Sequence, residues 1–469
     1  MVRLDSLAGR LLPIFALLFA DDLSAQTLNG RFLDAAVDSV VEAHLAGGQV
    51  PGLTVAIDQG GDLLHHQGYG HADLELGVLT PLDAVYEIGS VTKQFTAVLT
   101  LMFVEEGLLD LEADISRYPP SFDTGGREVP LRRLLDHTSG MKGYTESPVF
   151  GEIVTQALPP DTLLRLMELE EWDFEPGEGL IYNNTAYFLM GRILEEVSGS
   201  TYPELLEERI LGPLGMEDTH YCDQSRIVEG RARGYAPTED GLARAPYLDH
   251  RWPFAAGSMC STARDLIRWN QALHGGEVLS AESYRSLITP DALSDGSPIT
   301  YAKGLVHKQD SYGEVIEHGG GIFGFSTDVR YYPEEQLTVV VIQNGGSPGP
   351  GVVMDGVRGL LLAEVEQARG AYAGDLSLLA GTYRGPSRGA AMDMEVRAEG
   401  QTLLGQVNGS LEAELVHTAE GVFETPDGSQ VWFVGEDGEP LGDASAEAAA
   451  GVRFNMRGYG LYPLARQGG

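Results

Sequence analysis

Residues 89–107 read GSVTKQFTAVLTLMFVEEG, and this stretch predicts one long helix. Apolar residues dominate after Lys93, and Gly107 is a stop signal, so we expect a helix from Ser90 to Glu106. Ser90 and Lys93 are three residues apart, which places both side chains on one helix face, one turn apart. A serine this close to a base can lose its proton and attack a carbonyl carbon. The free N–H groups and positive dipole at the helix start favour the oxyanion that then develops.

Two other serines lie in patterns that can mark a nucleophile, and backbone arguments reject both. Ser139 has Lys142 three residues later, but Gly140 follows at once, so no helix is expected and the spacing carries no geometry. Ser347 lies in GGSPG, which matches the G-x-S-x-G pattern. That pattern needs the N–H of the next residue to bind an oxyanion, and Pro348 has none.

We do not expect a metal centre or a cofactor. His65, His66 and His71 lie close together in the sequence. Adjacent residues of a strand point to opposite faces, however, so His65 and His66 would not face one ion. The sequence also has no phosphate-binding loop.

Strand patterns lie at both ends of the first 369 residues, and helix patterns fill the middle. Strands are expected at 53–57, 63–69, 315–318, 324–332 and 337–343, and helices at 33–45, 184–198, 262–273 and 352–368. This order predicts an α+β fold, in which an antiparallel sheet of sequence-distant strands is flanked by helices and interrupted by a helical insertion. Short strand patterns at 392–396, 430–434 and 452–456 predict a small all-β, barrel-like domain. The expected domains are therefore 26–369 and 370–469.

The N-terminus has the pattern of a signal peptide. Arg3 and Arg10 precede or flank a largely apolar run at residues 11–20, and a cleavage site follows near residue 25. Residues 1–25 are therefore expected to be removed, with the protein exported to the periplasm or secreted. No stretch is long enough to span a bilayer in the mature chain. In an oxidising compartment Cys222 and Cys260 can pair, but the sequence leaves open whether they pair or remain two buried thiols.

The charge of the chain excludes some partners. The chain has 469 residues, with 69 acidic and 31 basic side chains and a net charge of -38. Such a surface repels nucleic acid and anionic lipid, so neither is an expected partner. The expected partner is a small-molecule or peptide substrate, and the sequence does not indicate an oligomeric state.

Three motifs in order make the chain resemble the serine β-lactamase and penicillin-binding superfamily. They are Ser90-Val91-Thr92-Lys93, Tyr182-Asn183-Asn184 and His318-Gly319-Gly320. The resemblance points to the branch that contains class C β-lactamases, D-alanyl-D-alanine carboxypeptidases, D-aminopeptidases and related esterases, and it covers roughly residues 30–368. Three framework stretches are also similar to this family: LLDHTSG at 134–140, PLGM at 213–216 and STARDL at 261–266.

The resemblance implies a β-lactamase/transpeptidase-like fold and a role for each motif. Ser90 is expected to attack the carbonyl carbon. Tyr182, kept partly deprotonated by the neighbouring Lys93, is expected to be the general base. Asn184 would hydrogen-bond an amide of the substrate. The backbone N–H groups of Ser90 and Gly321 would bind the oxyanion.

The third motif bears on the substrate. β-Lactamases of this branch typically carry Lys at the position of His318, where a fixed positive charge can hold a carboxylate. A His of ordinary pKa is mostly neutral at neutral pH. We therefore expect His318 and Gly320 in the substrate site of a peptidase, acting on D-amino-acid or peptidoglycan-type peptides, or of an esterase. A β-lactamase and a slowly deacylating sensor or binding protein are the alternatives. The C-terminal region resembles the barrel domains that D-aminopeptidases of this family append.

Overall fold

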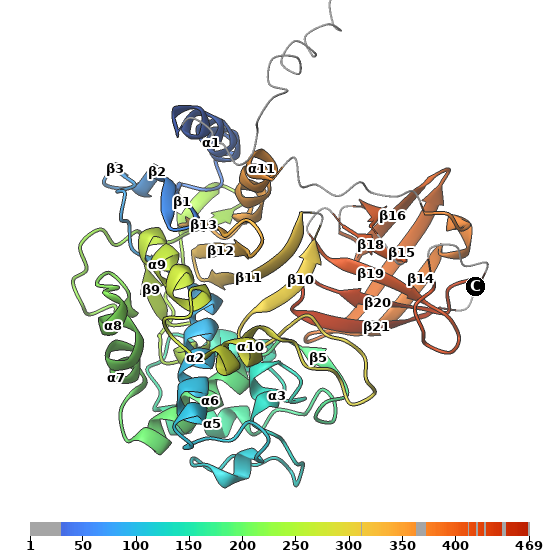
Figure 1. Ribbon diagram of the computed structural model, residues 1–469, viewed down its shortest axis with the longest axis horizontal. Helices are drawn as coiled ribbons and strands as arrows, with labels where there is room; N and C mark the ends of the chain where they lie inside the picture. The colour runs from blue at the N-terminus through green and yellow to red at the C-terminus, as the bar shows by residue number, and fades with distance from the viewer. Residues whose placement is uncertain are drawn as a thin grey trace, which may run out of the picture.

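The computed structural model describes residues 30–310, 312–362, 372–410, 412–418, 421–425, 428–442 and 447–467. The expected signal peptide, residues 1–25, and the expected domain boundary between residues 369 and 370 lie outside the described residues. The described residues form a lobe of helices and sheet beside a β-barrel (Figure 1).

An antiparallel sheet lies at the centre of the first lobe, with the strand order β10-β11-β12-β13-β1-β2-β3. Its strands are β1 Gly52–Gln59, β2 Asp62–Asp73, β3 Val78–Leu79, β10 Val306–Asp310, β11 Gly313–Ile322, β12 Phe325–Tyr332 and β13 Leu337–Gln343. Strand β1 from the start of the lobe pairs with β13 from its end, so that Val55 lies opposite Val341. The predicted α+β sheet of sequence-distant strands is therefore confirmed.

Most helices lie in the middle of the first lobe's sequence, as predicted, and α1 and α11 lie at its two ends. They are α1 Gly30–Leu45, α2 Thr92–Glu105, α3 Arg132–Leu135, α4 Phe150–Ile153, α5 Pro160–Met167, α6 Asn184–Ser198, α7 Tyr202–Leu206, α8 Gly212–Leu214, α9 Ala263–His274, α10 Ala281–Ile288 and α11 Gly351–Leu361. Small sheets join them: β4 Tyr86–Glu87 with β6 His220–Tyr221 and β9 Met259–Ser261, and β7 Tyr235–Thr238 with β8 Gly241–Arg244.

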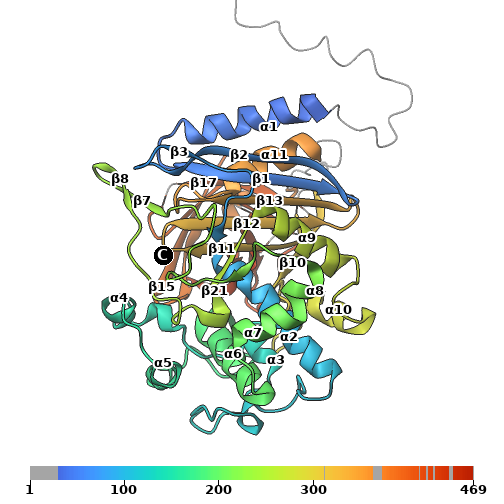
Figure 2. The ribbon, with the colours of Figure 1, turned by 90° about the vertical axis from the view of Figure 1, so that its left-hand side faces the viewer.

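Helices cover both faces of the central sheet, which explains why β1 is buried along all but its last residue. Leu53, Val55 and Ile57 belong to the same core as residues of α1 and α11. Ala56 joins the core around α2 instead, because side chains alternate between the two faces of a strand. Figure 2 shows α1 and α11 on one side of the sheet and the other helices of the lobe on the opposite side.

Helix α2 is buried on all sides and carries the predicted Ser-x-x-Lys motif at its start. The α-helix begins at Thr92, two residues later than predicted, because a single 3-10 turn at Gly89–Val91 precedes it. Gly89 has a φ of 53°, and a Cβ atom there would lie 2.9 Å from the nitrogen of Gly321. Only glycine allows this turn to lie so close to β11.

The C-terminal strands form an antiparallel barrel, which confirms the predicted all-β region. They are β14 Gly381–Pro386, β15 Ala391–Glu399, β16 Thr402–Val407, β17 Ala413–His417, β18 Val422–Glu424, β19 Gln430–Val434, β20 Gly451–Asn455 and β21 Gly460–Arg466. Neighbours in sequence pair in order, and β14 pairs with β21 to close the barrel. Its core is a separate cluster that includes Tyr383 and Phe433.

A short strand of the first lobe extends the barrel sheet. Strand β5, Leu180–Ile181, pairs with β21, so that Ile181 lies opposite Gly460. No local sequence pattern predicts this pairing. It brings the turn between β20 and β21 beside the residues that follow β5, which include Tyr182.

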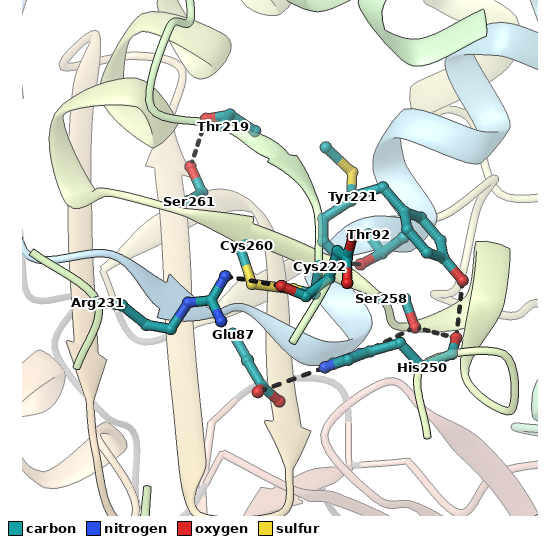
Figure 3. The surroundings of a disulfide bond; sticks show 12 residues. Glu87, Thr92, Thr219, Tyr221, Cys222, Arg231, His250, Ser258, Cys260 and Ser261 are labelled. Atoms are coloured by element: carbon teal, nitrogen blue, oxygen red, sulfur yellow. Dashed lines mark hydrogen bonds and ion pairs between the residues drawn. A yellow bond between two sulfur atoms is a disulfide. The ribbon is translucent and has the colours of Figure 1, made fainter. Parts of the chain in front are cut away.

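The two cysteines form a disulfide, which resolves the alternative that the sequence left open. Cys222 and Cys260 are bonded, and 38 positions separate them in sequence. Figure 3 shows the bond beside Glu87, Ser258 and the strands β6 and β9. Strand β9 pairs with β4, which leads to Ser90, so the disulfide braces the framework next to the Ser-x-x-Lys turn. Among the described residues, no helix has the length and apolar character needed to cross a membrane.

Candidate active site

Ser90 and Lys93 lie side by side, as the spacing predicted. The Lys93 Nζ is 3.3 Å from the Ser90 Oγ. It also lies 2.8 Å from the Asn184 Oδ1 and 2.7 Å from the backbone oxygen of Ala256. Lys93 is fully buried whereas Ser90 is partly exposed, so the hydroxyl is open to a substrate and the amine is not.

The surroundings of Lys93 favour its uncharged form. Burial lowers the pKa of Lys93 well below its ordinary value, and the positive charge of Arg388 lowers it further. A neutral amine has two N–H bonds and one lone pair. The oxygens of Asn184 and Ala256 can accept the two N–H bonds, which leaves the lone pair for the Ser90 hydroxyl. This arrangement can take a proton from Ser90.

Glycines bring strand β11 against the Ser90 turn. A Cβ atom on Gly320 would lie 2.0 Å from the backbone oxygen of Ile88 and 3.3 Å from the nitrogen of Ser90. The third motif therefore needs glycine for close backbone approach. Ser90 and Gly321 both line one cavity, so their backbone N–H groups are candidates to bind a carbonyl oxygen there.

The second motif follows β5 and starts α6. The side chain of Asn183 caps this helix, since its Oδ1 accepts the N–H of Ala186 at 2.9 Å. The Lys93 Nζ lies 4.6 Å from the centroid of the Tyr182 ring. The Asn184 Oδ1 contacts Lys93, and its Nδ2 is 3.3 Å from the Oγ1 of Thr145.

The ionisation of Tyr182 differs from the expectation of a partly deprotonated phenol. Burial raises the pKa of Tyr182 well above its ordinary value, and Ser90 and Arg388 offset this only in part. The Tyr182 hydroxyl is buried and makes no hydrogen bond of standard geometry within the described chain. Of the two candidate bases, the Lys93 amine is thus the one whose environment favours the basic form.

His318 lies beneath the cleft rather than on its surface. It is fully buried, with its Nε2 2.8 Å from the Tyr301 hydroxyl and its Nδ1 2.6 Å from the Gly319 oxygen. Burial and the nearby Lys93 lower the pKa of His318 to about 3, so it is neutral. A carbonyl oxygen only accepts, so Nδ1 donates to Gly319 and Nε2 accepts from Tyr301. His318 has the neutral charge that we expected, but it has no access to a substrate carboxylate.

Neither rejected nucleophile is among the residues that line the cavities at Ser90. Ser139 is fully buried, and its Oγ accepts the N–H of Met141 at 3.3 Å in a turn. Ser347 is exposed in the loop between β13 and α11. Within the described ranges, no group of three or more His, Cys, Asp or Glu side chains is placed to hold a metal ion.

Two cavities meet at Ser90. One has a volume of about 370 Å³, and much of its wall is apolar, with Tyr144, Phe150, Leu248, Phe323 and Phe325. The other has a volume of about 570 Å³, and its polar and charged lining includes Thr145, Tyr182, Asn184, Thr327, Asp328, Arg388, Arg457 and Tyr459.

The barrel supplies residues of the second cavity that the sequence analysis did not identify. The Tyr459 hydroxyl accepts the N–H of Gly319 at 2.6 Å, and the backbone oxygen of Tyr459 accepts the N–H of Tyr182 at 3.2 Å. Arg457 lies in the same β20–β21 turn as Tyr459, and Arg388 lies in the β14–β15 turn. No local motif marks these residues, because contacts between the two lobes bring their turns to the cleft: β5 pairs with β21, and Arg388 bonds to Thr145 and Glu146.

Sequence comparison agrees with the three motifs. The sequence model described as Beta-lactamase matches residues 37–364. The chain belongs to the Beta-lactamase family. Penicillin-binding protein 4* of Bacillus subtilis (strain 168) is 29% identical over 330 residues, which cover 67% of this chain and 71% of that protein.

Solved structures extend the likeness to both lobes. A D-stereospecific amidohydrolase from Streptomyces sp. is 28% identical, with a TM-score of 0.60 over 68% of this chain and 97% of its own. The octameric penicillin-binding protein homologue from Pyrococcus abyssi is 24% identical, with a TM-score of 0.63 over 92% of this chain and 100% of its own. This second likeness concerns the fold and includes the barrel. Family and relatives together identify this chain as a serine hydrolase of the β-lactamase and penicillin-binding superfamily.

Proposed function

We propose that this enzyme is a peptidase that cleaves amide bonds of D-amino-acid-containing peptides through an acyl-enzyme on Ser90. The observation that carries the proposal is the 3.3 Å approach of the Lys93 Nζ to the Ser90 Oγ, with the amine fully buried. Similarity to a D-stereospecific amidohydrolase and to a penicillin-binding protein supports the substrate class.

In the first step the Ser90 Oγ forms a bond to the carbonyl carbon, and its proton moves to the lone pair of Lys93. The carbonyl oxygen gains the negative charge and faces the N–H groups of Ser90 and Gly321. Asn184, which contacts Lys93 through its Oδ1, holds the amine in place and borders the substrate.

Collapse of this intermediate breaks the carbon–nitrogen bond. The leaving nitrogen takes the proton of the neutral Tyr182 phenol, and the Lys93 ammonium returns a proton to the Tyr182 oxygen. Water then attacks the acyl carbon and loses its proton to Lys93. The bond from the acyl carbon to the Ser90 Oγ breaks, the Lys93 ammonium returns the proton to that oxygen, and the acid is released. In this scheme Tyr182 transfers protons as a neutral phenol rather than acting as a standing phenolate base.

The test is turnover by the intact protein and by a Ser90→Ala variant. Three chromogenic substrates separate the possibilities: a D-alanyl nitroanilide, a short-chain nitrophenyl ester and a cephalosporin. We expect Ser90-dependent cleavage with the highest kcat/KM on the nitroanilide. Preference for the ester or for the cephalosporin would replace the peptidase proposal by an esterase or a β-lactamase. One equivalent of product followed by silence would identify a sensor.

We also propose that the protein is exported, with residues 1–25 removed and domains at 26–369 and 370–469. The Cys222–Cys260 disulfide supports an oxidising destination. Cell fractionation with N-terminal sequencing tests this. Recovery of unprocessed protein from the cytoplasm alone would contradict it.

A further inference from the structure

Two turns of the barrel form one wall of the polar cavity. The turn between β14 and β15 carries Arg388, and the turn between β20 and β21 carries Arg457 and Tyr459. All three line the cavity of about 570 Å³ that also contains Ser90 and Tyr182. The barrel therefore completes the catalytic cleft with two guanidinium groups.

Arg388 is held beside the catalytic residues by Glu146 and Thr145 but keeps donors free. Its Nε donates to the Glu146 carboxylate, and its Nη2 donates to the Thr145 hydroxyl at 2.9 Å. No hydrogen bond of its Nη1 appears among the described residues. The side chain is 32% exposed, and the guanidinium carbon lies 5.4 Å from the centroid of the Tyr182 ring. A guanidinium has five N–H groups, so three remain for a ligand.

Arg457 is held in an unusual backbone conformation at the same wall. Its φ is 53°, in a region that costs a side-chain-bearing residue free energy and is found often at binding sites. The side chain is 36% exposed, and its Nη2 lies 3.7 Å from the Asp328 carboxylate. Asp328 also accepts two hydrogen bonds from Arg330, which leaves the Arg457 donors only weakly engaged.

The other basic groups of the cleft do not carry a charge that a substrate can reach. His318 is a neutral, fully buried residue of β11, and Lys93 is buried with its N–H groups used. In a chain of net charge -38, an anionic group entering the cleft needs local cations. Arg388 and Arg457 are the cationic residues that line this cavity in the described part of the chain.

We propose that Arg388 and Arg457 bind a carboxylate on the leaving group of the substrate, which makes the enzyme a carboxypeptidase. Arg388 lies over the ring of Tyr182, the residue that delivers a proton to the leaving nitrogen, so the guanidinium is on the leaving-group side. The apolar cavity at Ser90 receives the acyl side. This inference rests on the proposed function, and the barrel takes over the carboxylate recognition that a lysine at the position of His318 would otherwise provide.

Binding to a Ser90→Ala protein tests the inference without any need for turnover. The ligands are acetyl-D-phenylalanyl-D-alanine and its C-terminal carboxamide, which differ only in the carboxylate, and calorimetry gives both Kd values. We expect the acid to bind about 10-fold or more tightly than the amide, from a charge-assisted pair of hydrogen bonds. Adding Arg388→Gln or, separately, Arg457→Gln is expected to reduce this ratio to about 3 or less, and Arg388→Lys to restore part of it.

The matched control is Arg397→Gln on β15, whose guanidinium pairs with Glu412 at the exposed surface. It should leave the acid-to-amide ratio unchanged, and thermal unfolding should show that every variant is folded. Equal affinity for acid and amide in the Ser90→Ala protein, no binding of either, or an unchanged ratio in both arginine variants would overturn the inference. Absence of Ser90-dependent turnover in the intact protein is a separate result, which would overturn the proposed function instead.

Discussion

Removal of the disulfide is expected to cost a measurable part of the folding free energy. The bond closes a loop between Cys222 and Cys260, 38 positions apart. The loop-entropy relation gives an entropy change of about 13 cal/mol/K for a loop of that length, which is about 4 kcal/mol at 25 °C. Since strain and residual structure usually reduce this value, we predict a loss of about 2–4 kcal/mol for the paired Cys222→Ala and Cys260→Ala substitution.

The assay is urea unfolding followed by tryptophan fluorescence, in which the fully buried Trp269 reports on the first lobe. A reductant supplies the matched control. It should lower the stability of the native protein toward that of the double variant, and it should leave the double variant unchanged. A loss below about 1 kcal/mol, or equal sensitivity of both proteins to reductant, would refute the loop argument.

Three further predictions concern the site and its support. Lys93→Met should lower kcat by about 10²–10⁴-fold. Because the neutral amine is the base, the activity of the parent should fall as pH drops through the lowered pKa of Lys93, and Arg388→Gln should move this fall to higher pH, since Arg388 lowers that pKa. A pH–rate profile without this fall would contradict the assignment. Burial raises the pKa of Asp136 from 3.8 to about 6, so the folded state is favoured most below pH 3.8, and this stability is lost as pH rises through 6. The difference between the two pKa values corresponds to about 3 kcal/mol. Asp136→Asn should therefore raise the free energy of unfolding by about 2–3 kcal/mol more at pH 8 than at pH 4, and an equal change at both pH values would count against it. Tyr459→Phe removes the hydroxyl that accepts the N–H of Gly319 at 2.6 Å. Urea unfolding should show a loss of about 1–3 kcal/mol in the free energy of unfolding. An unchanged free energy of unfolding would mean that the barrel turn does not hold β11.

The sequence predicted the parts of this fold that depend on local patterns. The apolar helix after Lys93, the alternating strands at both ends of the lobe and the short strands after residue 370 all lie where their periodicity placed them. Ser90 and Lys93 meet because a three-residue separation spans one helical turn in either a 3-10 or an α conformation. Local geometry of this kind does not require knowledge of the tertiary fold.

Features that depend on long-range contacts were missed. Sequence reasoning treated Tyr182 as a partly ionised base, whereas its pKa is set by burial among residues of both lobes. It placed His318 in the substrate site, whereas the side chain is fully buried and its Nε2 lies 2.8 Å from the Tyr301 hydroxyl. Arg388 and Arg457 lie in barrel turns without a motif, and long-range contacts such as the pairing of β5 with β21 and the bond from Arg388 to Thr145 hold those turns at the cleft.

Covalent labelling of Ser90 is the most direct measurement of the central claim. The intact protein and the Ser90→Ala variant would be treated with a fluorophosphonate, which reacts with activated serines, and the mass and the labelled peptide would be determined. We predict one adduct per chain on the peptide that contains Ser90, no adduct in the variant, and a slower reaction in Lys93→Met. Equal labelling of the variant, or an adduct on Ser139 or Ser347, would contradict the assignment of Ser90 as the nucleophile.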